Sequence, residues 1–183
     1  ITTNNKLLYK RLLLLRSHSL KKTSISDPYK VIETSSLNFR LGEINALIGI
    51  KQIENISFSK KKRNELIEKY LKNIKKFNKI FKSINFSNPN IFWHIFVIKI
   101  NKEFIQKKKI LMKYLLKNSI GCQVHYKPIC NHKSYKNIIL LNQNKNSQNF
   151  YRSQLTLPMH NKINFNDINY IVKKIATFFK LKL

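Results

Sequence analysis

An asparagine and an arginine stand directly before a predicted helix start. Asn38 and Arg40 precede a predicted helix that begins at Glu43 and has apolar residues at helical spacing from Ile44 onward. The first turn of a helix has unpaired N–H groups and a partial positive charge, so an amide and a guanidinium just ahead of it can hold a phosphate or a carboxylate. The same spacing also fits a plain loop that enters a helix. The pattern alone therefore offers either an anion site or a simple turn.

A second group of polar side chains follows Gly121. We predict a strand over residues 120–126, and alternate side chains of a strand share a face, so Gln123 and His125 would point toward one cleft while Tyr126 supports the other side. An amide and an imidazole that converge on one point suit sugar hydroxyls, an N-acetyl group or a diphosphate. His125 could equally be satisfied by backbone partners.

Two cysteines and two histidines in this region raise the alternative of a metal site. On the predicted strand, Cys122 and His125 would lie on opposite faces. The spacing Cys-x2-His-x4-Cys-x-His is not one that zinc sites use. We therefore expect no metal ligands here, and the two cysteines, Cys122 and Cys130, give no disulfide framework.

Four blocks of the chain resemble segments of one family, in the order in which that family carries them. The family is the DegT/DnrJ/EryC1/StrS group of pyridoxal-phosphate-dependent sugar aminotransferases. Because the blocks are spread along the chain, their order is more specific than any single block. They are residues 2–18 (TTNN to LLLLRSH), 37–49 (LNFRLGEINALIG), 121–129 (GCQVHYKPI) and 155–160 (LTLPMH).

The resemblance implies a fold and a division of the chain. The fold is α/β and corresponds to the small carboxyl-terminal domain of a fold-type I, aspartate aminotransferase-like, pyridoxal-phosphate enzyme, over residues 37–183. Residues 1–36 would then be a remnant of the large cofactor-binding domain plus a connecting loop. Gly42 stands where the family usually has a hydroxyl cap, which should cost a few tenths of a kcal/mol relative to serine or threonine.

The resemblance also implies roles for individual residues. Asn38 would contact the phosphate of pyridoxal 5'-phosphate in the neighbouring subunit of a homodimer with shared active sites. Arg40 would bind an anionic part of the cofactor or substrate, or else make a structural ion pair. Gln123, His125 and Tyr126 would contact the substrate.

The lysine that forms the Schiff base in this family lies ahead of the position that matches Ile1. The chain opens on Ile1, so we expect the carboxyl-terminal part of a longer protein that is inactive alone and holds no catalytic residue itself. The block around His125 resembles the branch that aminates a UDP-linked 4-keto-6-deoxy-N-acetylhexose in amino-sugar and surface polysaccharide biosynthesis. An amino acid such as glutamate is the expected nitrogen donor.

The formal net charge of +28 raises an alternative from another class, a basic nucleic-acid-binding module. Nearly all of this charge is lysine, whereas sequence-reading sites favour arginine. Lysine, asparagine and isoleucine are enriched together, which A/T-rich coding explains, and the run at 60–63 is typical of a solvated helix face. No apolar run reaches the roughly 18 residues of a membrane span, and cysteine usage fits the cytoplasm. We expect no specific nucleic-acid or membrane partner.

Periodicity predicts the elements that must hold these residues. We expect a first helix that Asn4 or Asn5 caps and that runs to about Arg16. Further helices are expected over 43–77 with a break near 56–59, over 103–118, and from Asn164 onward with Asp167 completing a capping box. Strands are expected over 91–100 and 120–126, with loops over 17–36 and 131–149. Such an order describes a small sheet covered by helices.

Overall fold

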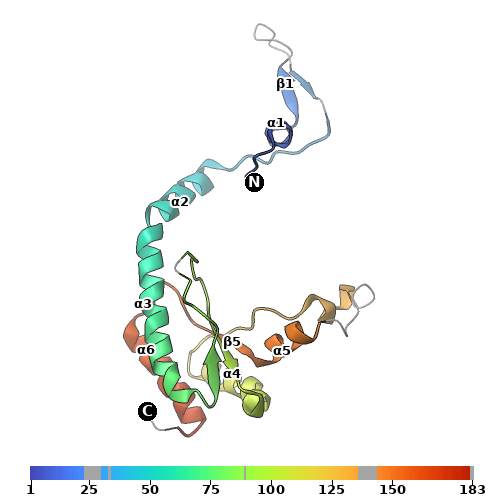
Figure 1. Cartoon of the computed structure of the whole chain (residues 1–183). Helices are drawn as coiled ribbons and strands as arrows, with labels where there is room; N and C mark the ends of the chain where they lie inside the picture. The colour runs from blue at the N-terminus through green and yellow to red at the C-terminus, as the bar shows by residue number, and fades with distance from the viewer. Residues whose placement is uncertain (23–29, 33, 89, 136–143, 182–183) are drawn as a thin grey trace. The chain divides into compact units, whose positions relative to one another are not determined.

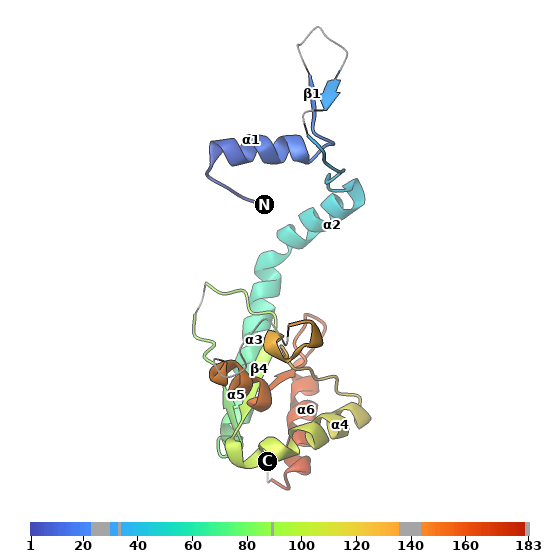
Figure 2. The same ribbon diagram turned by 90° about the vertical axis from the view of Figure 1, so that its right-hand side faces the viewer.

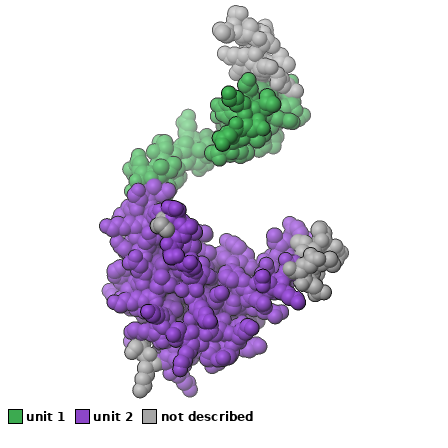
Figure 3. Space-filling view, in the orientation of Figure 1, with its two compact units in different colours: residues 1–55 green, residues 56–183 purple. Residues whose placement is uncertain are grey.

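The computed structural model describes residues 1–22, 30–32, 34–88, 90–135 and 144–181. They form two compact units, Ile1–Asn55 and Ile56–Leu183 (Figure 3), which are described separately below as unit 1 and unit 2. The domain boundary between residues 36 and 37 came from the resemblance to a family and stays a prediction.

Unit 1 begins with the helix predicted at the start of the chain. Helix α1 spans Lys6–Leu15. The Asn5 side chain caps it by accepting hydrogen bonds from the backbone N–H groups of Leu7 and Leu8, both at 3.0 Å. Two of the donors that a helix start leaves unpaired are thereby satisfied, and the predicted cap is confirmed.

The predicted connecting loop over 17–36 contains more regular structure than expected. Strand β1 (Leu20–Lys22) pairs antiparallel with β2 (Lys30–Ile32). An isolated bridge joins Ser17 to Asn38. The chain therefore returns to the carboxyl end of α1 immediately before the second helix.

The long helical region predicted over 43–77 is confirmed as two helices. Helix α2 spans Glu43–Glu54 and α3 spans Ile56–Ile74. The break falls at Asn55, just ahead of the predicted interval.

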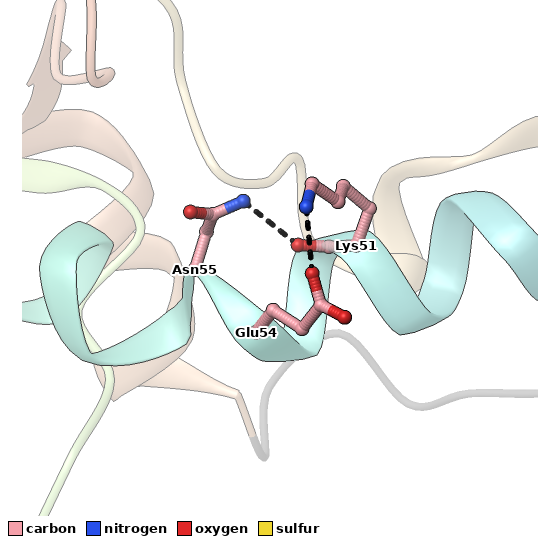
Figure 4. Close-up of polar contacts among 3 residues, drawn as sticks. All are labelled: Lys51, Glu54 and Asn55. Carbon is pink, nitrogen blue, oxygen red and sulfur yellow. Dashed lines mark hydrogen bonds and ion pairs between the residues drawn. The ribbon is translucent and has the colours of Figure 1, made fainter.

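The side chain of Asn55 ends α2. Its Nδ2 group donates to the carbonyl of Lys51 at 2.9 Å, and the Lys51 ammonium pairs with Glu54 Oε2 at 2.8 Å (Figure 4). An asparagine that hydrogen-bonds the backbone of the preceding turn favours a helix end over continuation.

Unit 2 is built on a three-stranded antiparallel sheet of order β3-β4-β5 (Figure 1). The strands are β3 (Phe81–Ser83), β4 (Phe96–Ile100) and β5 (Gln154–Leu157). Strand β4 starts later than the residue 91 predicted, and β3 was not predicted. All four residues of β5 are buried, so both faces of that strand are covered.

The last helix, α6 (Phe165–Phe178), begins at the predicted capping box. Asn164 Oδ1 accepts from the backbone N–H of Asp167 at 3.0 Å, and Asp167 Oδ2 accepts from the backbone N–H of Asn164 at 2.9 Å. This reciprocal pair fixes where α6 starts.

Helices α3 and α6 pack against each other, and α4 packs against α6 (Figures 1 and 2). Tyr70 of α3 stacks on Phe96 of β4 with ring centroids 4.5 Å apart. The Tyr70 hydroxyl donates to the carbonyl of Pro158 at 2.8 Å. The fully buried core includes Leu66, Tyr70, Phe96, Ile98, Leu111, Leu115, Leu155 and Ile168.

The helix predicted over 103–118 is divided. Residues Lys102–Lys107 form a 3-10 helix and Lys108–Lys117 form α4. The region 131–149, predicted as a loop, includes the start of α5 (Lys145–Ser153), while residues 136–143 lie outside the described part of the chain.

The strand predicted over 120–126 is wrong. This segment makes a single antiparallel bridge, between Gln123 and Thr156 of β5. Two residues beyond Thr156 stands Pro158, which has no N–H to donate, so the ladder cannot continue in that direction. Within the described residues, the Gln123–Thr156 bridge is the one point at which the segment pairs with β5.

Candidate functional site

The first group of predicted site residues lies in unit 1. Asn38 Oδ1 accepts two hydrogen bonds from Arg40, from the backbone N–H at 3.2 Å and from Nε at 3.0 Å. Both side chains are exposed. No described residue accepts a hydrogen bond from the Asn38 Nδ2 group. Asn38 therefore orients Arg40 with its oxygen and keeps its two N–H donors for a ligand.

Backbone hydrogen bonds fix where Asn38 stands. The N–H of His18 donates to the carbonyl of Leu37 at 3.2 Å, and the N–H of Phe39 donates to the carbonyl of Arg16 at 2.9 Å. The residue that caps α2 is Gly42, and it supplies no side-chain hydrogen bond. No side chain in the described part of the chain pairs with the first N–H groups of α2, a few residues after Asn38.

Large apolar side chains surround this group in the sequence and face solvent. Leu37 is 67% exposed, Phe39 64%, Leu41 71% and Ile44 75%. Exposed apolar residues that cluster in this way are typical of a surface that another body covers.

The second group lies in unit 2 and meets at Thr156. The backbone N–H of Gln123 donates to the Thr156 carbonyl at 3.1 Å, and the Thr156 N–H returns a bond to the Gln123 carbonyl at 2.8 Å. His125 Nδ1 lies 2.8 Å from Thr156 Oγ1. Among the described residues, the His125 imidazole is therefore held by a side-chain hydroxyl and by no backbone group.

Gln123 and His125 both line an open cleft of about 940 Å³. Its apolar lining includes Ile120, Leu157 and Met159. Its other polar and charged lining residues include His94, Lys117, Asn118, Thr156, His160, Lys162, Asp167 and Tyr170. This volume and this mixture of apolar surface with a few polar groups are usual for a ligand site.

Tyr126 is placed apart from this cleft. Its ring meets the His125 ring edge to face at 4.7 Å between centroids, and its side chain is 77% exposed. It lines a smaller hollow of about 440 Å³ together with Lys127, Pro128 and residues of α5. The structure thus joins Gln123 with His125 and leaves Tyr126 behind the imidazole.

Two residues that hold the cleft together were not singled out from the sequence. Thr156 lies in a block that the resemblance highlighted, but its partner His125 is 31 residues away. Arg63 of α3 donates from Nη1 to the carbonyls of His94 at 3.1 Å and Met159 at 3.4 Å. Both act through long-range contacts that leave no local pattern.

The alternative of a metal site gains no support within the described ranges, where no group of three or more histidine, cysteine, aspartate or glutamate residues could hold an ion. Cys122 and Cys130 are both free thiols, and burial raises the pKa of Cys122. No described helix is long and apolar enough to cross a membrane.

Residues 1–176 match the model of the DegT/DnrJ/EryC1/StrS aminotransferase family, and the chain belongs to this family. It is 32% identical over 172 residues to the UDP-4-amino-4,6-dideoxy-N-acetyl-beta-L-altrosamine transaminase of Campylobacter jejuni strain 81-176, a match that covers 93% of the chain and 45% of that protein. The enzyme of the same name from Helicobacter pylori is 27% identical and matches 98% of the chain and 48% of its own length.

Solved structures agree with this assignment. The Helicobacter pylori PseC structure, an aminotransferase involved in the biosynthesis of pseudoaminic acid, superposes with a TM-score of 0.83 at 28% identity and covers 97% of the chain and 47% of its own. The PLP-form structure of Spr1654 from Streptococcus pneumoniae, named a putative sugar aminotransferase, has a TM-score of 0.83 at 19% identity, which shows the shared fold. The predicted α/β fold of a pyridoxal-phosphate aminotransferase is confirmed. The chain spans about half the length of these relatives.

Proposed function

We propose that this chain is the carboxyl-terminal portion of a pyridoxal 5'-phosphate-dependent aminotransferase that aminates a nucleotide-linked keto-sugar. The observation that carries the proposal is the match of residues 1–176 to one aminotransferase family. The substrate proposed is a UDP-4-keto-6-deoxy-N-acetylhexose with glutamate as nitrogen donor, in amino-sugar and surface polysaccharide biosynthesis. The names of the similar Campylobacter and Helicobacter enzymes support this choice.

Asn38 and Arg40 fit the phosphate of the cofactor. The Asn38 amide has two N–H groups without a described acceptor, and Arg40 is held beside it by the bonds to Asn38 Oδ1. Neutral and cationic donors side by side suit a dianionic phosphate. When bound, the cofactor supplies an electron sink for the carbanion that transamination requires.

The site is proposed to be completed by other parts of the protein. The lysine that carries the cofactor would come from the segment that precedes residue 1 in the longer relatives, and Asn38 would serve the neighbouring subunit of a homodimer. The exposed side chains of Leu37, Phe39 and Leu41 support such an arrangement, because they require cover.

Gln123 and His125 are proposed to bind the sugar nucleotide. The hydrogen bond to Thr156 restricts rotation of the His125 ring and leaves Nε2 for the ligand. Tyr126 would support the imidazole from behind by its edge-to-face contact. The two free cysteines fit a reducing cytoplasm as the compartment.

A chimera tests this function. The chain would replace the matched stretch of the Campylobacter jejuni transaminase, so that it follows that enzyme's own amino-terminal part. We expect the chimera to bind pyridoxal phosphate and to transfer the amino group of glutamate to the UDP-keto-sugar, whereas the chain alone does neither specifically. A folded, dimeric chimera that retains the cofactor without any turnover would refute the proposed substrate.

A further inference from the structure

The cleft of unit 2 carries an excess of positive charge that the residues discussed so far leave unexplained. Its lining includes Lys117, at the end of α4, and Lys162, in the loop before α6. Both lysines are exposed. Neither makes an ion pair with any residue in the described part of the chain.

Three imidazoles add possible hydrogen-bond donors to the same cleft. His94, His125 and His160 all line the cleft. The carbonyl of His94 is tied to α3 by Arg63 at 3.1 Å, and the same guanidinium reaches the residue before His160, Met159, at 3.4 Å. The Arg63 side chain therefore holds the backbone of both segments, the one that carries His94 and the one that carries His160.

One carboxylate lines the cleft, and it is already engaged. Asp167 Oδ2 accepts the backbone N–H of Asn164 at 2.9 Å in the capping box of α6. The cleft is thus lined by two ammonium groups without an ion-pair partner among the described residues and by a single carboxylate that has another role. A ligand that binds between them should carry more than one negative charge.

Part of the cleft is apolar. Ile120, Leu157 and Ile163 are buried residues that line it. A volume of about 940 Å³ is much larger than a lone phosphate requires and matches the range of sites for cofactor-sized ligands. A compact anion would leave most of this volume filled with water, whereas a nucleoside would occupy it.

We propose that Lys117 and Lys162 bind the diphosphate of a nucleoside diphosphate whose nucleoside lies on the apolar part of the cleft. This inference rests on the proposed function, since it names the part of the sugar nucleotide that unit 2 recognises. His94 and His160 donate to the same phosphates. Gln123 and His125 then stand at the sugar end of the ligand.

The signals of the five histidines can show where on the chain a ligand binds. His94, His125 and His160 line the cleft, whereas His18 and His132 do not. The probe is the NMR spectrum of the imidazole C–H groups of the full chain. It is recorded at about 0.15 M salt, where exposed charges farther apart than about 8 Å are screened. Addition of UDP should shift the signals of His94, His125 and His160 until the site is saturated. Inorganic pyrophosphate should shift them more weakly, because it lacks the nucleoside.

Matched lysine variants separate this site from the general charge of the protein. Lys117→Gln with Lys162→Gln should weaken UDP binding about tenfold, as expected for two exposed charge contacts. The control pair is Lys113→Gln, one turn earlier on α4, with Lys72→Gln on α3; neither residue lines the cleft. This pair removes the same charge from a net +28 and should leave the affinity unchanged.

Three results would overturn the inference. Equal losses in the two double variants, equal shifts of all five histidine signals, or pyrophosphate binding as tightly as UDP would each show that the cleft does not recognise a nucleoside diphosphate. UDP binding needs neither the cofactor nor turnover. An absence of UDP binding would therefore refute this inference alone, while an inactive chimera that still binds UDP in the cleft would refute only the proposed function.

Discussion

Replacing Asn38 by alanine is the sharpest test of the cofactor site. The change removes the Oδ1 atom that accepts from the backbone N–H and Nε of Arg40 at 3.2 and 3.0 Å. Both residues are exposed, so water can replace these bonds and the local cost should be about 1 kcal/mol or less. The loss of a hydrogen bond to a charged phosphate should cost about 1.5 to 3 kcal/mol, or roughly ten- to a hundredfold in cofactor affinity.

Equilibrium dialysis of complete subunits against pyridoxal phosphate measures this loss. The matched control is Asn55→Ala, which also removes an exposed asparagine hydrogen bond in unit 1, the 2.9 Å bond to the Lys51 carbonyl. We expect normal cofactor retention for Asn55→Ala. The midpoint of thermal unfolding of both variants should stay within a few degrees of that of the unchanged protein.

Mixed dimers test whether Asn38 acts across the subunit interface. A subunit with the cofactor lysine but Asn38→Ala should form one complete site with a subunit that retains Asn38 but lacks the lysine. Activity in that heterodimer, absent from both parents, is the expected result. If dimers form normally and no activity returns, the cross-subunit role is refuted and Asn38 is a turn residue.

Three further outcomes are expected. Asn164→Ala removes the oxygen that caps α6 and should destabilise unit 2 by about 1 kcal/mol in urea unfolding. The contrast is Asn166→Ala in the same helix, which should not destabilise unit 2, because this exposed side chain has no hydrogen-bond partner among the described residues. Burial, and to a smaller extent Asp167, raises the pKa of Tyr70 well above its usual range. The phenol of the unfolded chain ionises at about pH 10, so the free energy of unfolding should decrease as the pH rises above that value. Tyr70→Phe should make this decrease less steep. Duplex DNA should bind weakly, without sequence preference and with a steep salt dependence, and tight sequence-selective binding at about 0.2 M salt would favour the nucleic-acid module.

Signals that lie within a few residues of each other were predicted correctly from the sequence. The Asn5 cap of α1 and the Asn164 and Asp167 capping box depend on partners two or three residues apart, so the pattern contains the whole interaction. The separation of α2 from α3 was also predicted, although Asn55 sets it slightly earlier.

Interactions between distant residues were not predictable in the same way. A strand over 120–126 requires a continuous partner, and the neighbouring β5 offers Thr156 but is followed by Pro158. The anchor of His125 and the two carbonyls held by Arg63 likewise come from other parts of the chain. The residue types of the candidate site could therefore be predicted from the sequence, whereas the long-range hydrogen bonds that hold those residues in place could not.

The two groups of site residues differ in what they need from the rest of the protein. Gln123 and His125 are fixed on Thr156 and lie in a cleft whose lining belongs entirely to unit 2. Asn38 and Arg40 are fixed on each other but stand among exposed apolar residues that require a covering body. Nucleotide binding should consequently survive in the chain alone, while cofactor retention should appear only in the assembled enzyme. A chain that bound pyridoxal phosphate tightly by itself, or bound UDP only after assembly, would contradict this division of roles.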